Sequence, residues 1–262
     1  RGCLLRFLQA RDGDAGRASE MLRATARWRH ENHVNSMSSM PPCDIRSEAM
    51  SRMREYWPGY CVGLTKDGSP VLYTNASLVT QALYEFDEES LRLLYIGWME
   101  QSLHLQTVGL QRLAGAGGCE GPGRPAPTLP QNIEVFNFGG LSALQLARRA
   151  LMLARSANFV KIGVAHYPEH LRKCYLINTP TVFSVVTNLV LKALPPATRC
   201  KIEVSSDSNY RAFREFMEPE QIEAMLGFTT NPSAGGPEVL AVVRDTTAAW
   251  KRKHGLERFA EL

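Results

Sequence analysis

The chain has 262 residues, of which 44% are hydrophobic and 21% are charged, and its formal net charge at pH 7 is +4. This composition is typical of a globular protein, and the length suits one large domain with an accessory segment. No apolar run approaches the roughly 20 residues that a membrane-spanning helix needs, which excludes that class. The six cysteines contain no CxxC pair and are too few for a disulfide scaffold, so we expect a reducing, cytoplasmic location.

The first 30 residues predict two helices. Apolar positions three and four residues apart define one face of each, namely Leu4, Leu5 and Leu8, then Met21, Leu22, Thr25 and Trp28. Asp14 precedes the second helix and is expected to be its N-cap. The chain starts inside an apolar pattern, so we expect this helical part to be truncated at its start.

From Tyr60 the periodicity changes. Residues 60–64 and 70–75 are β-prone and are joined through Lys66-Asp67-Gly68, which predicts a hairpin. Residues 87–113 predict a long helix with three acidic residues in its first turn. The Gly-, Pro- and Ala-rich residues 114–131 predict an exposed insertion.

Strand and helix patterns then alternate. Strands are expected at 133–138, 173–178 and 201–205, and helices at 141–158, 181–192 and 209–217. This alternation predicts an α/β domain with a mostly parallel sheet and flanking helices. Residues 237–254 predict a further amphipathic helix. We therefore expect a helical N-terminal subdomain over 1–57, an α/β domain over 58–230 with the insertion 114–131, and a C-terminal tail over 231–262.

The sequence carries no pattern typical of catalysis. It lacks a phosphate-binding GxxxxGK[ST] loop, a GxSxG turn and an HExxH helix, so we expect no enzymatic activity, no cofactor and no metal site. Residues 141–175 are basic but lack an array of aromatic residues for base stacking, so nucleic-acid binding is not expected. This basic window is interpreted either as a solvated helix face or as a surface for anionic lipid head groups.

Four segments in a fixed order resemble the CRAL-TRIO lipid-binding family. They are residues 4–11 with Asp14 and the helix that follows, Lys66-Asp67-Gly68 with Pro70-Val71, residues 167–184 from Tyr-Pro-Glu-His-Leu through Asn-Thr-Pro to Phe183-Ser184, and Lys192, Pro196, Thr198, Lys201 and Ile202. Together these segments cover roughly residues 1–230. By motif the chain is most similar to the phosphatidylinositol-transfer proteins of this family.

The resemblance implies a helical N-terminal subdomain on a CRAL-TRIO lobe, with an apolar lipid cavity closed by a mobile helix. That gate would lie at residues 181–193. The implied head-group residues are Arg11, Glu169, Thr198 and Lys201. The implied cavity and gate residues are Tyr167, Phe183, Val186, Leu189 and Val190.

The implied function is to shelter a phosphatidylinositol-type phospholipid in this gated cavity and to exchange it at membrane surfaces. The protein would be a monomer that associates transiently with membranes. Phosphatidylcholine-binding relatives carry a serine and a threonine on the strand that here reads Asn132-Ile133-Glu134, so the second ligand stays open. Two alternatives remain: a carrier of another hydrophobic ligand, such as a sterol, a tocopherol-like compound or a retinoid, or a membrane-positioning module of a larger protein.

Overall fold

The computed structural model describes residues 2–35, 59–65, 67–115, 129–141, 144, 158–180, 191, 194, 196–207, 210–219, 222 and 225. Five strands form one sheet in sequential order: β1 (Gly59–Leu64), β2 (Pro70–Asn75), β3 (Asn132–Asn137), β4 (Leu171–Ile177) and β5 (Ile202–Val204). β1 and β2 form the expected antiparallel hairpin, and every other neighbouring pair is parallel. The predicted α/β fold with a mostly parallel sheet is therefore confirmed.

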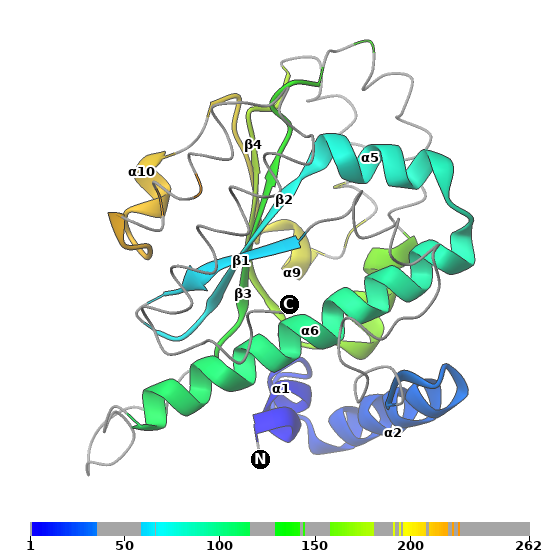
Figure 1. Ribbon diagram of the computed structural model, residues 1–262. Coiled ribbons are helices and arrows are strands. Elements are labelled where there is room, and N and C mark those ends of the chain that lie inside the picture. The colour runs from blue at the N-terminus through cyan, green and yellow to red at the C-terminus, as the bar shows by residue number, and fades with distance from the viewer. Residues whose placement is uncertain are drawn as a thin grey trace.

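The described residues include the helices α1 (Gly2–Gln9), α2 (Ala15–Glu31), α5 (Ala76–Glu85), α6 (Glu88–Gly115), α9 (Pro196–Arg199) and α10 (Tyr210–Phe213). A further helical segment runs over 158–166. α6 and α10 lie on opposite sides of the sheet, and α1 and α2 lie below α6 (Figure 1). The parallel strands follow each other with helical segments between them, which is the arrangement expected of right-handed βαβ crossovers.

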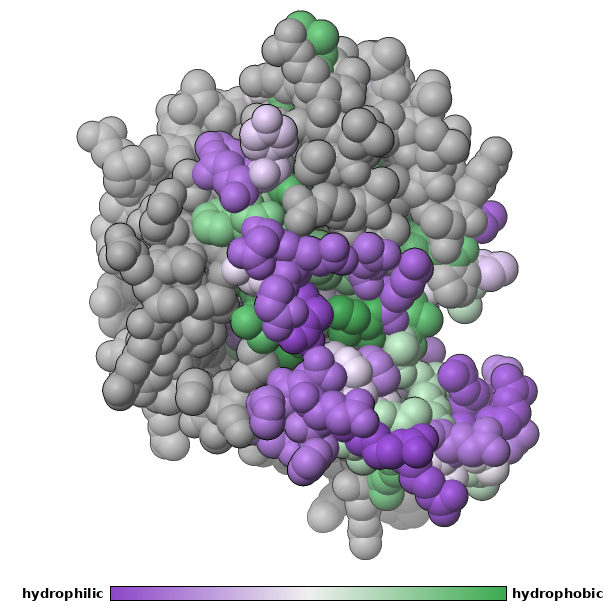
Figure 2. Space-filling view, turned by 90° about the vertical axis from the view of Figure 1, so that its right-hand side faces the viewer, coloured by the Kyte–Doolittle hydropathy of each residue, from purple (hydrophilic) through white to green (hydrophobic). Residues whose placement is uncertain are grey.

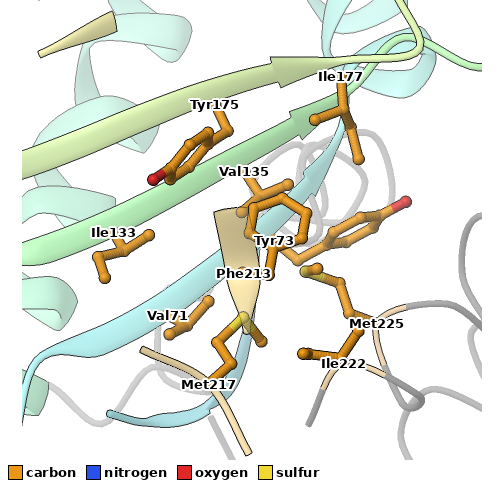
Figure 3. Close-up of a cluster of buried hydrophobic side chains, with 10 residues drawn as sticks. All are labelled: Val71, Tyr73, Ile133, Val135, Tyr175, Ile177, Phe213, Met217, Ile222 and Met225. Carbon is orange, nitrogen blue, oxygen red and sulfur yellow. The ribbon is translucent and has the colours of Figure 1, made fainter. Parts of the chain in front are cut away.

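One face of the sheet packs against the segment that contains α10. The side chains in this cluster alternate along the strands and meet four residues of the C-terminal segment: Val71, Tyr73, Ile133, Val135, Tyr175, Ile177, Phe213, Met217, Ile222 and Met225. Phe213 is fully buried at the centre of the cluster and meets Tyr175 edge to face (Figure 3). Strand alternation therefore places the odd-numbered residues of β2, β3 and β4 on this face.

The opposite face carries the even-numbered residues of the same strands. Leu72 packs there with Trp98, Met99 and Leu105 of α6 and with Tyr167. In the register of the sheet, Leu72 lies beside Glu134 and Glu134 beside Cys174. The α6 face thus carries a carboxyl group between Leu72 and Cys174, which we consider below.

The N-terminal helices pack on each other through a small core of Phe7, Ala18 and Met21. Asp14 caps α2 as predicted, because its side chain accepts a hydrogen bond from the backbone N–H of Arg17 at 3.0 Å. The predicted apolar face of α1 is wrong in part: Leu8 packs against this core, but Leu4 and Leu5 are 54% and 49% exposed. The reason is that α1 is anchored by Phe7, Leu8 and the buried Arg6.

Several predicted segments cannot be compared. The expected helices over 181–192 and 237–254 fall outside the described residues, apart from residue 191, as do residues 116–128 of the insertion. The first two residues of that predicted insertion, Ala114 and Gly115, belong to α6. Of the expected helix over 141–158, only residues 141, 144 and 158 belong to the described part of the chain, and residues 158–166 are helical.

One side of the molecule shows hydrophilic residues over much of its described surface, with apolar residues gathered between them near the middle (Figure 2). Its lower part is where α2 lies in Figure 1, and the exposed side of α2 carries Arg17, Arg23 and Arg27. Among the helices in the described ranges, none has the length and apolar character required to cross a bilayer.

Candidate functional site

The turn that joins the helical segment 158–166 to β4 has an unusual backbone. Glu169 occupies the left-handed region with φ +50°, a conformation that residues other than glycine adopt at a cost of about 1 kcal/mol or more. It follows Pro168 and precedes His170 and Leu171, where β4 starts. Such a conformation persists only where neighbouring groups hold it, so the contacts of this turn matter.

The carboxylate of Glu169 lies beside the ammonium group of Lys201. Lys201 Nζ is 3.4 Å from Glu169 Oε2 and donates a hydrogen bond to the Leu171 carbonyl oxygen at 2.8 Å. The two side chains are 26% and 31% exposed, so both reach solvent. Gln131 completes the group, because its Nε2 donates to Glu169 Oε2 at 2.9 Å and to the Glu169 carbonyl oxygen at 3.0 Å.

The structure connects Thr198 to this group through the backbone. Thr198 lies on α9, just before β5, and its carbonyl oxygen accepts a hydrogen bond from the Lys201 backbone N–H at 3.1 Å. Arg11 is placed after the end of α1, where its guanidinium donates to the carbonyl oxygen of the adjacent Ala10 at 3.0 Å. Of the four predicted head-group residues, Glu169 and Lys201 are therefore in side-chain contact, and Thr198 lies three residues before Lys201 in the chain. Arg11 is hydrogen-bonded to its sequence neighbour Ala10.

Tyr167 lies under the N-terminal helices. It is 5% exposed, and its hydroxyl donates to Glu100 Oε1 at 2.8 Å. Its ring meets Trp28 of α2 edge to face at 6.0 Å. Burial and the adjacent Glu100 charge raise the pKa of Tyr167, so it stays a hydrogen-bond donor. The other predicted cavity and gate residues, Phe183, Val186, Leu189 and Val190, lie outside the described residues.

Two further residues at this site were missed from the sequence. Arg6 is 8% exposed; it donates to the carbonyl oxygens of Glu169 and of Pro130, each at 2.5 Å. Gln131 is the other. Nothing in the sequence marks Gln131, and the only signal for Arg6 is a charged residue between Leu5 and Phe7 of an apolar helix.

A buried polar cluster lies next to Arg6, on the α6 side. Gln106 Nε2 donates to Asn132 Oδ1 at 2.6 Å and to the His170 carbonyl oxygen at 3.1 Å. His170 is 4% exposed, and burial together with the Arg6 charge lowers its pKa to about 3. The imidazole is therefore neutral at physiological pH. Within the described part of the chain, Gln106 Oε1 is buried without a hydrogen-bond partner.

Glu134 is the carboxyl group on the α6 face of the sheet. It is partly accessible, yet protein surrounds it closely enough that burial raises its pKa to about 7, with a hydrogen bond from Asn132 acting in the opposite direction. Its charge also raises the pKa of the Tyr95 hydroxyl and the Cys174 thiol, in both cases after burial as the larger cause. A carboxyl group in these surroundings can donate or accept a hydrogen bond near neutral pH. Among the described residues, no cluster of three side chains could hold a metal ion.

Comparisons with known proteins agree with this architecture. The model of the CRAL/TRIO domain matches residues 54–227. The chain is 24% identical over 265 residues to the phosphatidylinositol/phosphatidylcholine transfer protein SFH9 of Arabidopsis thaliana, covering 95% of this chain and 43% of that protein. It is 27% identical over 226 residues to the SEC14 cytosolic factor of Eremothecium gossypii, covering 86% of this chain and 68% of that protein.

The match to a solved structure concerns the fold. The crystal structure of Sfh5 superposes with a TM-score of 0.55 at 16% sequence identity, covering 83% of this chain and 67% of that one. The chain thus spans less than half of the plant relative and about two thirds of the fungal one. The chain therefore belongs to the CRAL/TRIO domain family, as the resemblance in the sequence predicts.

Proposed function

We propose that this chain binds a phosphatidylinositol-type phospholipid in a gated hydrophobic cavity and exchanges it at membrane surfaces. The observation that supports this most is the Glu169–Lys201 pair beside Thr198, at the edge of the sheet where β4 and β5 begin. In this proposal the protein works as a cytoplasmic monomer that meets membranes transiently.

The chemistry of these groups suits an inositol phosphate. An ammonium group attracts a phosphodiester, and a carboxylate accepts hydrogen bonds from ring hydroxyls. The ammonium group of Lys201 has three N–H donors, and its contacts with Glu169 Oε2 and the Leu171 carbonyl oxygen use two of them. One donor is therefore available for a phosphate oxygen, while the hydroxyl of Thr198 can supply a second. The guanidinium of Arg11 would add a further contact if its side chain moved to the phosphate of the bound lipid.

The energetics of transfer explain why a cavity is needed. Two acyl chains expose on the order of thirty methylene groups, and at about 0.8 kcal/mol each their exposure to water costs more than 20 kcal/mol. A cavity lined by apolar side chains holds the chains at nearly the free energy of the bilayer. Exchange then becomes close to thermoneutral, and opening the gate at the membrane is the remaining barrier. Phe183, Val186, Leu189 and Val190 are the proposed gate residues.

The experiment is a transfer assay between donor liposomes that carry labelled phosphatidylinositol and unlabelled acceptor liposomes. We expect the unmodified chain to transfer the label, and Lys201→Ala to transfer it at a rate lower by about tenfold, the usual effect of removing a charged hydrogen bond. Lys173→Ala is the matched control, because Lys173 of β4 forms a similar bridge of 3.6 Å to Glu203 of β5.

Two results would contradict the proposal. One is the absence of phosphatidylinositol transfer by the unmodified chain. The other is full transfer by Lys201→Ala, which would show that the ammonium group does not contact the head group. A comparable loss in Lys173→Ala would also count against it, because that lysine pairs with Glu203 and does not belong to the site.

A second candidate ligand class is favoured by Glu134. A carboxyl group beside the apolar side chains of this face accepts a hydrogen bond from a single hydroxyl, which is the polar group of a sterol, a tocopherol-like compound or a retinoid alcohol. Mass spectrometry of the ligand that co-purifies with the chain separates the two candidates. A phospholipid supports the first proposal, and a neutral hydroxylated ligand supports the second.

A further inference from the structure

We propose that Arg6 and Gln131 are positioning residues that aim the carboxylate of Glu169 at the inositol ring and so set the head-group selectivity of this chain. The inference rests on the proposed function of the Glu169–Lys201 site. It adds two residues from parts of the chain that are distant in sequence, α1 and the segment before β3. Neither is argued to touch the lipid.

Arg6 holds the backbone of the turn. Its two terminal nitrogens donate to two different carbonyl oxygens, one of Glu169 and one of Pro130. These acceptors lie 163 and 124 residues away in sequence. The planar guanidinium therefore fixes the turn at Glu169 relative to the segment that leads into β3. Because Arg6 is 8% exposed, its removal would take this donor from the Pro130 carbonyl in a buried place and leave the Glu169 carbonyl with the Gln131 amide alone.

Gln131 holds the side chain of the same residue. Its amide nitrogen donates to Glu169 Oε2, the oxygen that also faces Lys201 Nζ. Among the described residues, the hydrogen bonds that this carboxylate accepts all fall on Oε2. Oε1 is then the oxygen left to accept a hydrogen bond from a ligand hydroxyl. The left-handed backbone of Glu169, with φ +50°, makes this orientation depend on outside support.

A purely structural role for Arg6 is the competing explanation. In that case Arg6 would only attach α1 to the lobe, and its loss would weaken binding of every lipid equally. The positioning role predicts a different result: only the preference for the inositol ring changes. The measurement must therefore compare two lipids that share the phosphate and the acyl chains but differ in the ring.

Phosphatidylinositol and phosphatidic acid form such a pair. The purified chain is incubated with phosphatidylcholine vesicles that contain equal amounts of both, separated from them, and its bound lipids are counted by mass spectrometry. The ratio of the two bound lipids, divided by their ratio in the vesicles, is the enrichment. Only folded protein retains lipid, so the enrichment does not depend on how much of a variant is folded.

Four variants decide the question. We expect Glu169→Gln to lower the enrichment about tenfold, and Arg6→Lys and Gln131→Leu to lower it by at least about threefold each, with the total bound lipid unchanged. Arg92→Ala is the matched control, because Arg92 of α6 also joins the helical pair to the lobe, by a hydrogen bond of 2.6 Å to Asn32, and does not contact the turn. Its enrichment should equal that of the unmodified chain.

The possible outcomes are distinct. If Glu169→Gln loses the enrichment but Arg6→Lys and Gln131→Leu keep it, the positioning role is wrong while the proposed function stands. The same holds if these variants bind less of both lipids at an unchanged enrichment. If the unmodified chain shows no enrichment, the proposed inositol ligand itself is wrong. Because the two residues belong to different segments, one variant gives the answer if the other does not fold.

Discussion

Replacing Glu134 by glutamine should stabilise the protein more at high pH than at low pH. The folded pKa of about 7 lies above the value of 4.5 for the free side chain, so ionising this group costs folding free energy. The cost begins as the pH rises past 4.5, grows until the folded pKa is passed, and is constant above it. At about 1.4 kcal/mol per pH unit, the difference amounts to about 3 kcal/mol at pH 8 and about 1 kcal/mol at pH 5.

Glutamine removes the charge while keeping the shape and a hydrogen bond to Asn132. Urea unfolding of both proteins at pH 5 and pH 8, followed by circular dichroism, therefore measures the effect directly. We expect the gain from Glu134→Gln to be larger at pH 8 by about 2 kcal/mol. Glu203→Gln is the control for the loss of one negative charge, because this strand residue is 43% exposed. An equal gain at both pH values would refute the argument that burial raises the pKa of Glu134.

Two further predictions concern packing and thiol chemistry. Gly109→Ala should destabilise the protein by about 2 kcal/mol or more, because the added Cβ would lie 1.9 Å from the Gly68 carbonyl oxygen in the β1–β2 turn. Gly97→Ala on the same helix should stabilise the protein by up to about 1 kcal/mol, because its Cβ would meet nothing within 4 Å. Equal shifts of the two melting temperatures would contradict this. Cys200 is exposed and should react with a maleimide in the folded protein, whereas Cys174 is buried with a raised pKa and should react only on unfolding. Peptide mapping by mass spectrometry measures the labelling of each cysteine. Equal labelling of both in the folded protein would contradict the prediction.

The secondary structure was predictable where one periodicity dominated. The hairpin of β1 and β2, the long α6 and the three parallel strands all followed from local patterns. α5 was missed because Ala76–Glu85 starts directly after β2, with no turn signal between strand and helix. The prediction that Leu4 and Leu5 belong to the packed face of α1 was wrong. Periodicity shows which residues share a face of a helix, but it cannot show which face packs against another element.

The candidate site was predictable only in part. Glu169, Thr198 and Lys201 came from a resemblance to a family, and the structure brings Glu169 and Lys201 into contact. Arg6 and Gln131 could not be found, because their contacts join segments that are far apart in sequence and depend on the tertiary fold. The pKa of Glu134 belongs to the same class, since burial by other elements causes it.

The segment matched by the CRAL/TRIO family model is shorter than the set of elements that pack together. The family match starts at residue 54, so a fragment cut there would lose α1 and α2. It would leave the Glu169 and Pro130 carbonyls without the donors of Arg6, and Glu100 without the two-pronged hydrogen bond from Arg29. Domain boundaries for expression should therefore include α1 and α2, because Arg6 and Arg29 on these helices form hydrogen bonds with the α/β lobe.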